Sequence, residues 1–93
     1  MHLGFSIQAQ NPIIDSLENE LNLIQKDDKT KVDLLNTLSS KYAKIDLDKA
    51  IEIAKEVNIL TKKIAYKKGE ARNYGILSNI HINKNELDEA EKN

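Results

Sequence analysis

Hydrophobic residues recur three and four residues apart along most of this chain, which is the period of an amphipathic α-helix. From residue 13 onward they form four successive stripes. The apolar members are Ile13, Ile14, Leu17, Leu21 and Ile24 in the first stripe, Val32, Leu34, Leu35, Leu38 and Tyr42 in the second, Ala50, Ile51, Ala54, Val57, Leu60 and Ile64 in the third, and Ala71, Tyr74, Leu77 and Ile82 in the fourth. No polar–apolar alternation persists, so the pattern predicts helices and no strands.

Capping residues mark the starts of the first three predicted helices. Asn11 can cap the first helix, and it precedes a proline, which the first helical position tolerates. This helix is expected to end in the polar cluster 25–29. The second helix begins near Thr30, and the third runs from about residue 47 to residue 65 with Asp46 as its cap.

Two further connections are predicted nearer the C-terminus. The first is the Lys-Lys-Gly segment 67–69, and the second is the Asn-Lys-Asn segment 83–85, because asparagine tolerates a left-handed backbone. A fifth helix then opens at residue 86 and is cut off at Asn93. Negative charge at Asp28 and Glu86 suits helix starts, where it meets the positive end of the helix dipole. The chain is thus expected to be all-α, with about five helices.

Two of these units repeat the same spacing. In each, four positions lie at 0, +3, +4 and +7, and an alanine follows eight or nine residues later. The two sets are Leu35, Leu38, Ser39, Tyr42 and Ala50, and Tyr74, Leu77, Ser78, His81 and Ala90. Such self-similarity indicates a stacked helical array.

The pattern resembles the tetratricopeptide repeat, in which a large residue is followed by leucine, a small residue, tyrosine and a later alanine. The chain departs from it in four ways. Leu35 stands where tryptophan is usual, and His81 replaces tyrosine. The distance from Ala50 to Ala90 is 40 residues rather than about 34, and no proline closes a repeat.

The resemblance implies a division of the chain into a capping helix at 11–29, a first repeat at 30–69 and a second, truncated repeat at 70–93. The helical hairpins would stack as a fragment of an α-solenoid, because the apolar faces of one pair are covered only by the next pair. Small residues would allow close approach of helices, and the large residues, among them Tyr74, would fill the space between them. His81 would likewise pack between helices.

The function implied by the resemblance is binding of a protein or peptide on a concave face lined by the first helix of each repeat. Arg72 with Asn79 could receive a carboxylate or a peptide backbone, and Asp33 could receive a basic residue. The candidate partner-binding residues are Asp33, Asn36, Ser40, Arg72 and Asn79. A solvated helix face is the alternative interpretation of these five positions.

The long repeat and its short turns are similar to tetratricopeptide segments at the amino end of bacterial sensor histidine kinases and related regulators. This implies a role in signal transduction within a larger protein. Residues 1–10 carry a short apolar stretch followed by Gln-Ala-Gln, which resembles the end of a signal peptide. The segment would then be exported to the periplasm. If these residues are instead an ordinary frayed terminus, the segment would be cytoplasmic.

Composition narrows the function classes. Fourteen Lys and Arg residues balance fifteen Asp and Glu residues among 93, so no general attraction to nucleic acid or anionic lipid is expected. Cysteine is absent, which excludes disulfides and thiolate metal sites. No nucleophile elbow, phosphate-binding glycine loop or zinc-binding motif occurs, and no apolar run approaches the roughly 20 residues of a membrane span. We therefore expect no enzyme activity, no cofactor, no metal and no direct membrane insertion.

Two alternative functions remain open from the sequence. The first is structural self-association as a homodimer through the truncated C-terminal helix, where Leu87 and Ala90 would expose apolar surface to a second copy. The second is a pocket for a small ligand between helices, because Tyr74 and His81 share a face.

Overall fold

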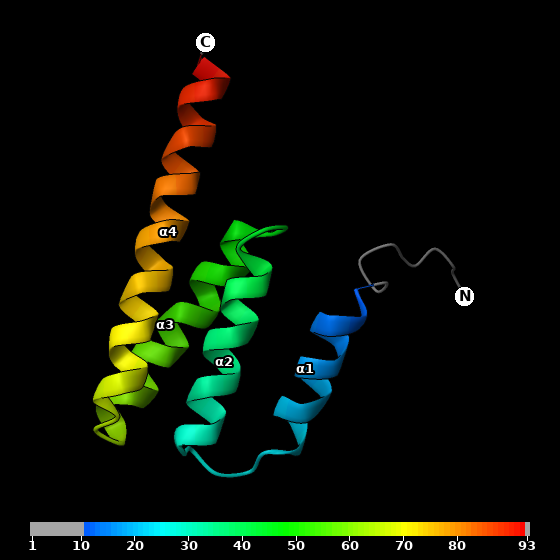
Figure 1. Cartoon of the computed structure of the whole chain (residues 1–93), viewed down its shortest axis with the longest axis vertical. Helices are drawn as coiled ribbons and strands as arrows, with labels where there is room; N and C mark the ends of the chain where they lie inside the picture. The colour runs from blue at the N-terminus through cyan, green and yellow to red at the C-terminus, as the bar shows by residue number, and fades with distance from the viewer. Residues whose placement is uncertain (1–10, 93) are drawn as a thin grey trace.

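The computed structural model describes residues 11–92, and the side chains of residues 11–90. Within this range the chain forms four helices and no strands, which confirms the all-α class. The helices are α1 (Pro12–Leu23), α2 (Lys29–Tyr42), α3 (Leu47–Lys63) and α4 (Lys67–Lys92). Each runs antiparallel to the one before it, so α2 and α4 point in the same direction (Figure 1). The predicted export signal at residues 1–10 lies outside the described residues.

Side-chain caps begin the first three helices, because the first N–H groups of a helix have no partner within it. Asn11, Asp28 and Asp46 each accept a hydrogen bond from the backbone N–H three residues later, at 3.0–3.1 Å. The predicted caps at Asn11 and Asp46 are confirmed, as is the role of Asp28 at a helix start. These short-range bonds explain why the starts of α1, α2 and α3 could be predicted within one residue.

The connection between α3 and α4 lies at residues 64–66, not at the predicted segment 67–69, which is the first turn of α4. Ala65 adopts a left-handed backbone with φ of 56°, the conformation that usually calls for glycine. The N–H of Tyr66 donates to the carbonyl of Thr61 at 2.9 Å, as in a Schellman motif. An alanine therefore ends α3, and no local sequence signal marks it.

The expectation of about five helices is wrong, because α4 continues through the predicted turn at residues 83–85 to Lys92. Asparagine lowers helix stability by well under 1 kcal/mol per residue, and neither glycine nor proline interrupts this segment. Lys84 also contacts Asp48 of α3 at 3.7 Å. Glu86 consequently lies inside α4 rather than at a helix start.

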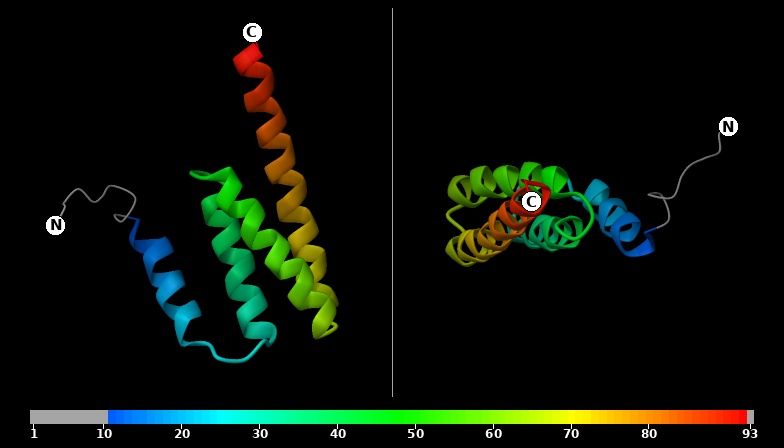
Figure 2. Two further views of the ribbon diagram at one scale, coloured as in Figure 1. Left: turned by 180° about the vertical axis from the view of Figure 1, so that it is seen from behind. Right: turned by 90° about the horizontal axis from the view of Figure 1, so that it is seen from above.

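The hydrophobic core lies where α3 packs across α2 and α4, while α1 packs against α2 on the other side (Figure 2). The buried cluster comprises Ile14, Val32, Leu35, Leu38, Ile53, Val57 and Leu60. Close approach of α2 and α3 depends on small residues, since the hydroxyl of the fully buried Ser39 donates to the carbonyl of Ala50 at 3.0 Å. Ile80 extends the buried surface into α4.

The buried face of α4 is not the one that the repeat pattern predicts. Asn73 and Ile80 are fully buried, whereas Tyr74 is 51% exposed and His81 is exposed. One residue along a helix is a rotation of about 100°, so Tyr74 and His81 do not share the buried side of α4 with Asn73 and Ile80. The expectation that Tyr74 and His81 pack between helices is wrong for the described part of the chain.

Candidate partner-binding surface

Neighbouring faces of α2 and α4 carry mostly polar side chains at the same spacing. On each helix three residues lie at 0, +4 and +7, which places them in one row. The rows are Asp33, Thr37 and Ser40 on α2, and Arg72, Ile76 and Asn79 on α4, and each member of the second row follows its counterpart by 39 residues. Because α2 and α4 run in the same direction, the rows lie in equivalent positions, and we call them together the α2–α4 face (Figure 1).

Direct contacts join the two rows. The guanidinium of Arg72 donates from Nη2 to the hydroxyl of Thr37 at 3.1 Å. Farther along, Ser40, Ile76 and Asn79 line a cleft of about 230 Å³. The remaining lining residues are Ala43, Lys44 and Asn83. The α2–α4 face therefore offers hydroxyl, amide and guanidinium groups around the exposed part of one isoleucine.

Asp33 lies at one end of the α2–α4 face and is already engaged. The hydroxyl of Tyr66 donates to Oδ1 of Asp33 at 2.8 Å, and this bond, with partial burial, raises the pKa of the Tyr66 phenol. The ammonium of Lys29 lies 5.3 Å from the centre of the same ring. A carboxylate has about four acceptor sites, so Asp33 retains the capacity to accept a basic group from a partner.

Asn36 does not lie on the α2–α4 face, and its assignment to the partner-binding set is wrong in this respect. Its side chain is fully buried, and Nδ2 donates to the carbonyl of Gly69 at 3.1 Å. This bond offsets part of the cost of burying the amide, whose Oδ1 finds no partner among the described residues. The other four predicted residues are exposed or half-buried along the two rows.

Sequence reasoning missed Thr37, Ile76 and Asn83 as members or neighbours of this surface. The signal that could have found Thr37 and Ile76 is the 39-residue offset that relates Leu35 to Tyr74. The same offset, counted from the second predicted helix to the fourth, relates Thr37 to Ile76 and Ser40 to Asn79. The choice of polar residues that point away from the apolar stripe left out the isoleucine.

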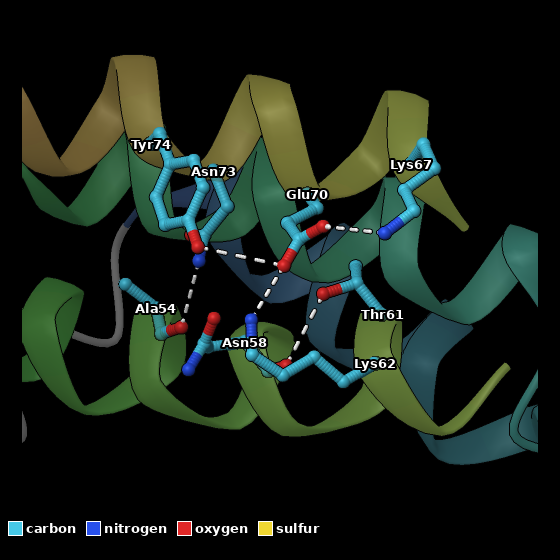
Figure 3. Close-up of polar contacts among 8 residues, drawn as sticks. All are labelled: Ala54, Asn58, Thr61, Lys62, Lys67, Glu70, Asn73 and Tyr74. Atoms are coloured by element: carbon cyan, nitrogen blue, oxygen red, sulfur yellow. Dashed lines mark hydrogen bonds and ion pairs between the residues drawn. The ribbon is translucent and has the colours of Figure 1, made fainter. Parts of the chain in front are cut away.

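A second polar cluster joins α3 to α4 on the side away from α2 (Figure 3). The ammonium of Lys62 lies 2.5 Å from Glu70 and lowers the pKa of that carboxyl, and the hydroxyl of Tyr74 donates to Glu70 at 3.4 Å. Beneath them, Nδ2 of the buried Asn73 donates to the carbonyl of Ala54 at 3.0 Å. These bonds fix the position of α4 along α3.

The part of the chain that the structure describes contains neither a cluster of metal-binding side chains nor a membrane-spanning helix. Among the described residues, no group of three or more His, Asp or Glu side chains lies close enough to hold a metal ion. His81, the histidine of α4, is exposed. The four helices include none that is long and apolar enough to cross a bilayer.

Comparisons with protein-family models, with curated proteins and with solved structures found no match. The interpretation of the α2–α4 face therefore depends on its geometry and chemistry.

Proposed function

We propose that this chain is a helical-repeat segment of tetratricopeptide type that binds a protein or peptide along the α2–α4 face and catalyses no reaction. The observation that carries the proposal is the pair of mostly polar rows at equal spacing on two parallel, adjacent helices. Repeated helices that present equivalent side chains in register form a continuous surface, which is the kind of surface that extended partners use.

The dimensions of the α2–α4 face suit a short extended peptide. Arg72 and Asn83 are separated by eleven residues of α4, a rise of about 16 Å at 1.5 Å per residue. An extended chain covers about 3.3–3.6 Å per residue, so this length accommodates roughly five residues of peptide. Side-chain amides and hydroxyls can bond its backbone groups, while Ile76 offers one apolar contact.

The charges of this surface suggest how such a peptide is oriented. Asp33 and Arg72 lie toward one end of the two rows, and Lys44 lies at the other end, beside Asn83. Arg72 is the residue best suited to a carboxylate, because its planar guanidinium can donate two parallel hydrogen bonds. A partner with an acidic side chain or a C-terminal carboxylate near Arg72 would satisfy this arrangement.

A role in a bacterial signalling or regulatory protein is also part of the proposal. Its support is the resemblance of the long repeat to the amino-terminal segments of sensor histidine kinases. The peptide-binding function does not depend on it.

A peptide-display selection against the purified chain tests the function. Affinities of the selected peptides are then measured for the wild-type chain and for Arg72→Glu, Asn79→Ala and Lys55→Glu. Lys55 is exposed on α3, away from the α2–α4 face, and serves as the matched charge-reversal control.

We expect Arg72→Glu to weaken binding at least tenfold, about 1.4 kcal/mol. Asn79→Ala should weaken binding less, and Lys55→Glu should leave it unchanged. Selected peptides that bind all four proteins equally well would contradict the assignment of the α2–α4 face.

A further inference from the structure

The side of α4 that faces away from its buried residues carries a row of exposed side chains, of which Tyr74 borders the polar cluster between α3 and α4 (Figure 3). All five members are exposed, and Tyr74 and Ile82 are 51% and 54% exposed. We call this row the outer stripe of α4: Ala71, Tyr74, Ser78, Ile82 and Asn85. At 100° per residue the five side chains lie within about 80° of the helix circumference, so they form one narrow surface.

Charge is distributed unequally along α4. Its first two turns carry three basic residues against one acidic residue, and residues 84–89 carry three acidic residues against one basic residue. The basic residues of the first part are Lys67, Lys68 and Arg72, and the acidic residues of the second part are Glu86, Asp88 and Glu89. Two such helices attract each other when they run antiparallel and repel each other when they run parallel.

We propose that a second copy of this chain binds the outer stripe of α4, with the two α4 helices antiparallel and the two-fold axis at Ser78. The two facing serines allow the helices to approach closely. In this register Tyr74 of each copy lies against Ile82 of the other, and Ala71 lies against Asn85. At the ends, Lys67 lies opposite Glu89, since both are within about 20° of the centre of the stripe.

The same surface serves both copies in this arrangement, as a two-fold symmetric interface requires. It pairs the two large exposed apolar side chains of the stripe with each other and matches opposite charges at both ends. This self-complementarity is the reason why a second copy, rather than an unrelated protein, is the partner that the stripe fits.

This interface differs from the self-association suggested by the sequence, which used Leu87 and Ala90 at the end of the last helix. Leu87 faces the α2–α3 turn and lines a cleft there with Ile45 and Leu47. The outer stripe lies about 130° around α4 from the α2–α4 face. A dimer would thus leave both peptide-binding surfaces open, and the two proposals can fail independently.

Sedimentation equilibrium of the full chain is the first test, from about 1 µM to roughly 1 mM, the range suited to a small interface. We expect the mass to rise toward twice the 10.6 kDa of one chain. Ile82→Glu should keep the chain monomeric throughout. The matched control is Ile59→Glu, on the exposed side of α3 and 67% exposed, which should dimerise like the wild type.

Crosslinking tests the register. Facing helices 8–10 Å apart bring the two Ser78 Cα atoms to about 5 Å, within the 4.4–6.8 Å that a disulfide spans. The chain has no cysteine, so Ser78→Cys introduces a single thiol. Under mild oxidation we expect it to form a covalent dimer at least tenfold faster than Ser16→Cys, whose exposed serine lies on α1.

A charge-swap experiment tests the antiparallel orientation. One variant carries Lys67→Glu, and the other carries Glu89→Lys. Each places charge where the dipole of α4 favours it, so loss of folding is not expected. Each alone should be monomeric, since both ends of its interface would carry like charge, and an equimolar mixture should dimerise.

A wild-type chain that stays monomeric to about 1 mM would overturn the proposal. Equal oxidation rates for the two cysteine variants would do the same, as would a charge-swap mixture that remains monomeric.

Discussion

Alanine substitution of the two glycines in α4 should change stability in opposite directions. At Gly69 an added Cβ would lie 2.7 Å from Cγ1 of Val32 and 2.7 Å from Cδ2 of Tyr66, closer than side-chain carbons normally approach. At Gly75 an added Cβ would meet no atom within 4 Å. The two sites share a helix and a substitution, so they differ mainly in the space around the new methyl group.

The magnitudes follow from two opposing effects. Alanine is favoured over glycine in a helix interior by about 1 kcal/mol, and Gly75→Ala should gain nearly all of it, which corresponds to a rise in Tm of about 4–8 °C. Gly69→Ala gains less, because it lies in the first turn. Its methyl group must displace a fully buried valine, and overpacking of this kind costs about 1–3 kcal/mol. We expect a net loss of about 1–2 kcal/mol.

A second contact increases the cost at Gly69. Its carbonyl accepts the hydrogen bond from Nδ2 of Asn36, and a shift of α4 away from Val32 would lengthen that bond. A buried amide that loses its partner destabilises the folded chain by about 1–3 kcal/mol. The helix therefore cannot relieve the overlap by moving without a further penalty.

Urea unfolding followed by far-ultraviolet circular dichroism measures both changes. The samples should be dilute enough to be monomeric, because Gly75 lies beside the outer stripe of α4. If Gly69→Ala stabilises the chain as much as Gly75→Ala does, α4 does not approach Val32 as closely as described. If Gly75→Ala destabilises it, the helix is not regular at this position.

Three further predictions concern single side chains. Asn73→Asp should lower the free energy of unfolding by about 3–5 kcal/mol at neutral pH, because it buries an unpaired charge, and the lost stability should return below about pH 4. The control Asn79→Asp is exposed and should change stability little. Urea unfolding of both variants as a function of pH tests this. Burial and the hydrogen bond to Glu18 raise the pKa of Tyr42 from 10.0 to about 12. The phenol therefore stabilises the folded chain below pH 10, and this stabilisation is lost as pH rises toward 12. In Tyr42→Phe, the free energy of unfolding should lack this fall between pH 10 and 12. Ala65→Gly should raise the free energy of unfolding by about 0.5–1 kcal/mol, because glycine adopts the left-handed backbone of this position without strain. Thermal unfolding measures the change, and a lower Tm for the variant would contradict the prediction.

The parts of the fold that were predictable are those with local causes. Asn11 and Asp46 accept hydrogen bonds from residues three positions away, so their capping role is visible in a short stretch of sequence. The apolar spacing of α2 and α3 likewise reflects one buried face per helix. The all-α class follows from these short-range features alone.

The parts that were not predictable depend on tertiary contacts or on small energy differences. Residues 83–85 resemble a turn, but two asparagines cost a helix too little to end it. Ala65 ends α3 in a backbone conformation that its identity does not signal. Which face of α4 is buried depends on where α2 and α3 lie, so neither Tyr74 nor His81 could be placed from spacing alone.

The candidate site shows the same division. The polar rows of α2 and α4 follow from helical spacing, which is why Ser40, Arg72 and Asn79 could be selected. Asn36 has the same polarity and a similar position in the sequence, yet it is buried. Its burial depends on the carbonyl of Gly69, a residue 33 positions away that has no side chain to fill the space.

The buried asparagines link the packing of this fold to its proposed function. Asn36 bonds α2 to α4, and Asn73 bonds α4 to α3, each through a backbone carbonyl of the neighbouring helix. An apolar contact would tolerate sliding along the helix, whereas an amide must remain within about 3 Å of its acceptor. A slip of one turn would move the row of α4 by 5.4 Å and separate Arg72 from Thr37. The two asparagines therefore hold the rows in register, and the binding surface depends on buried residues that no partner touches.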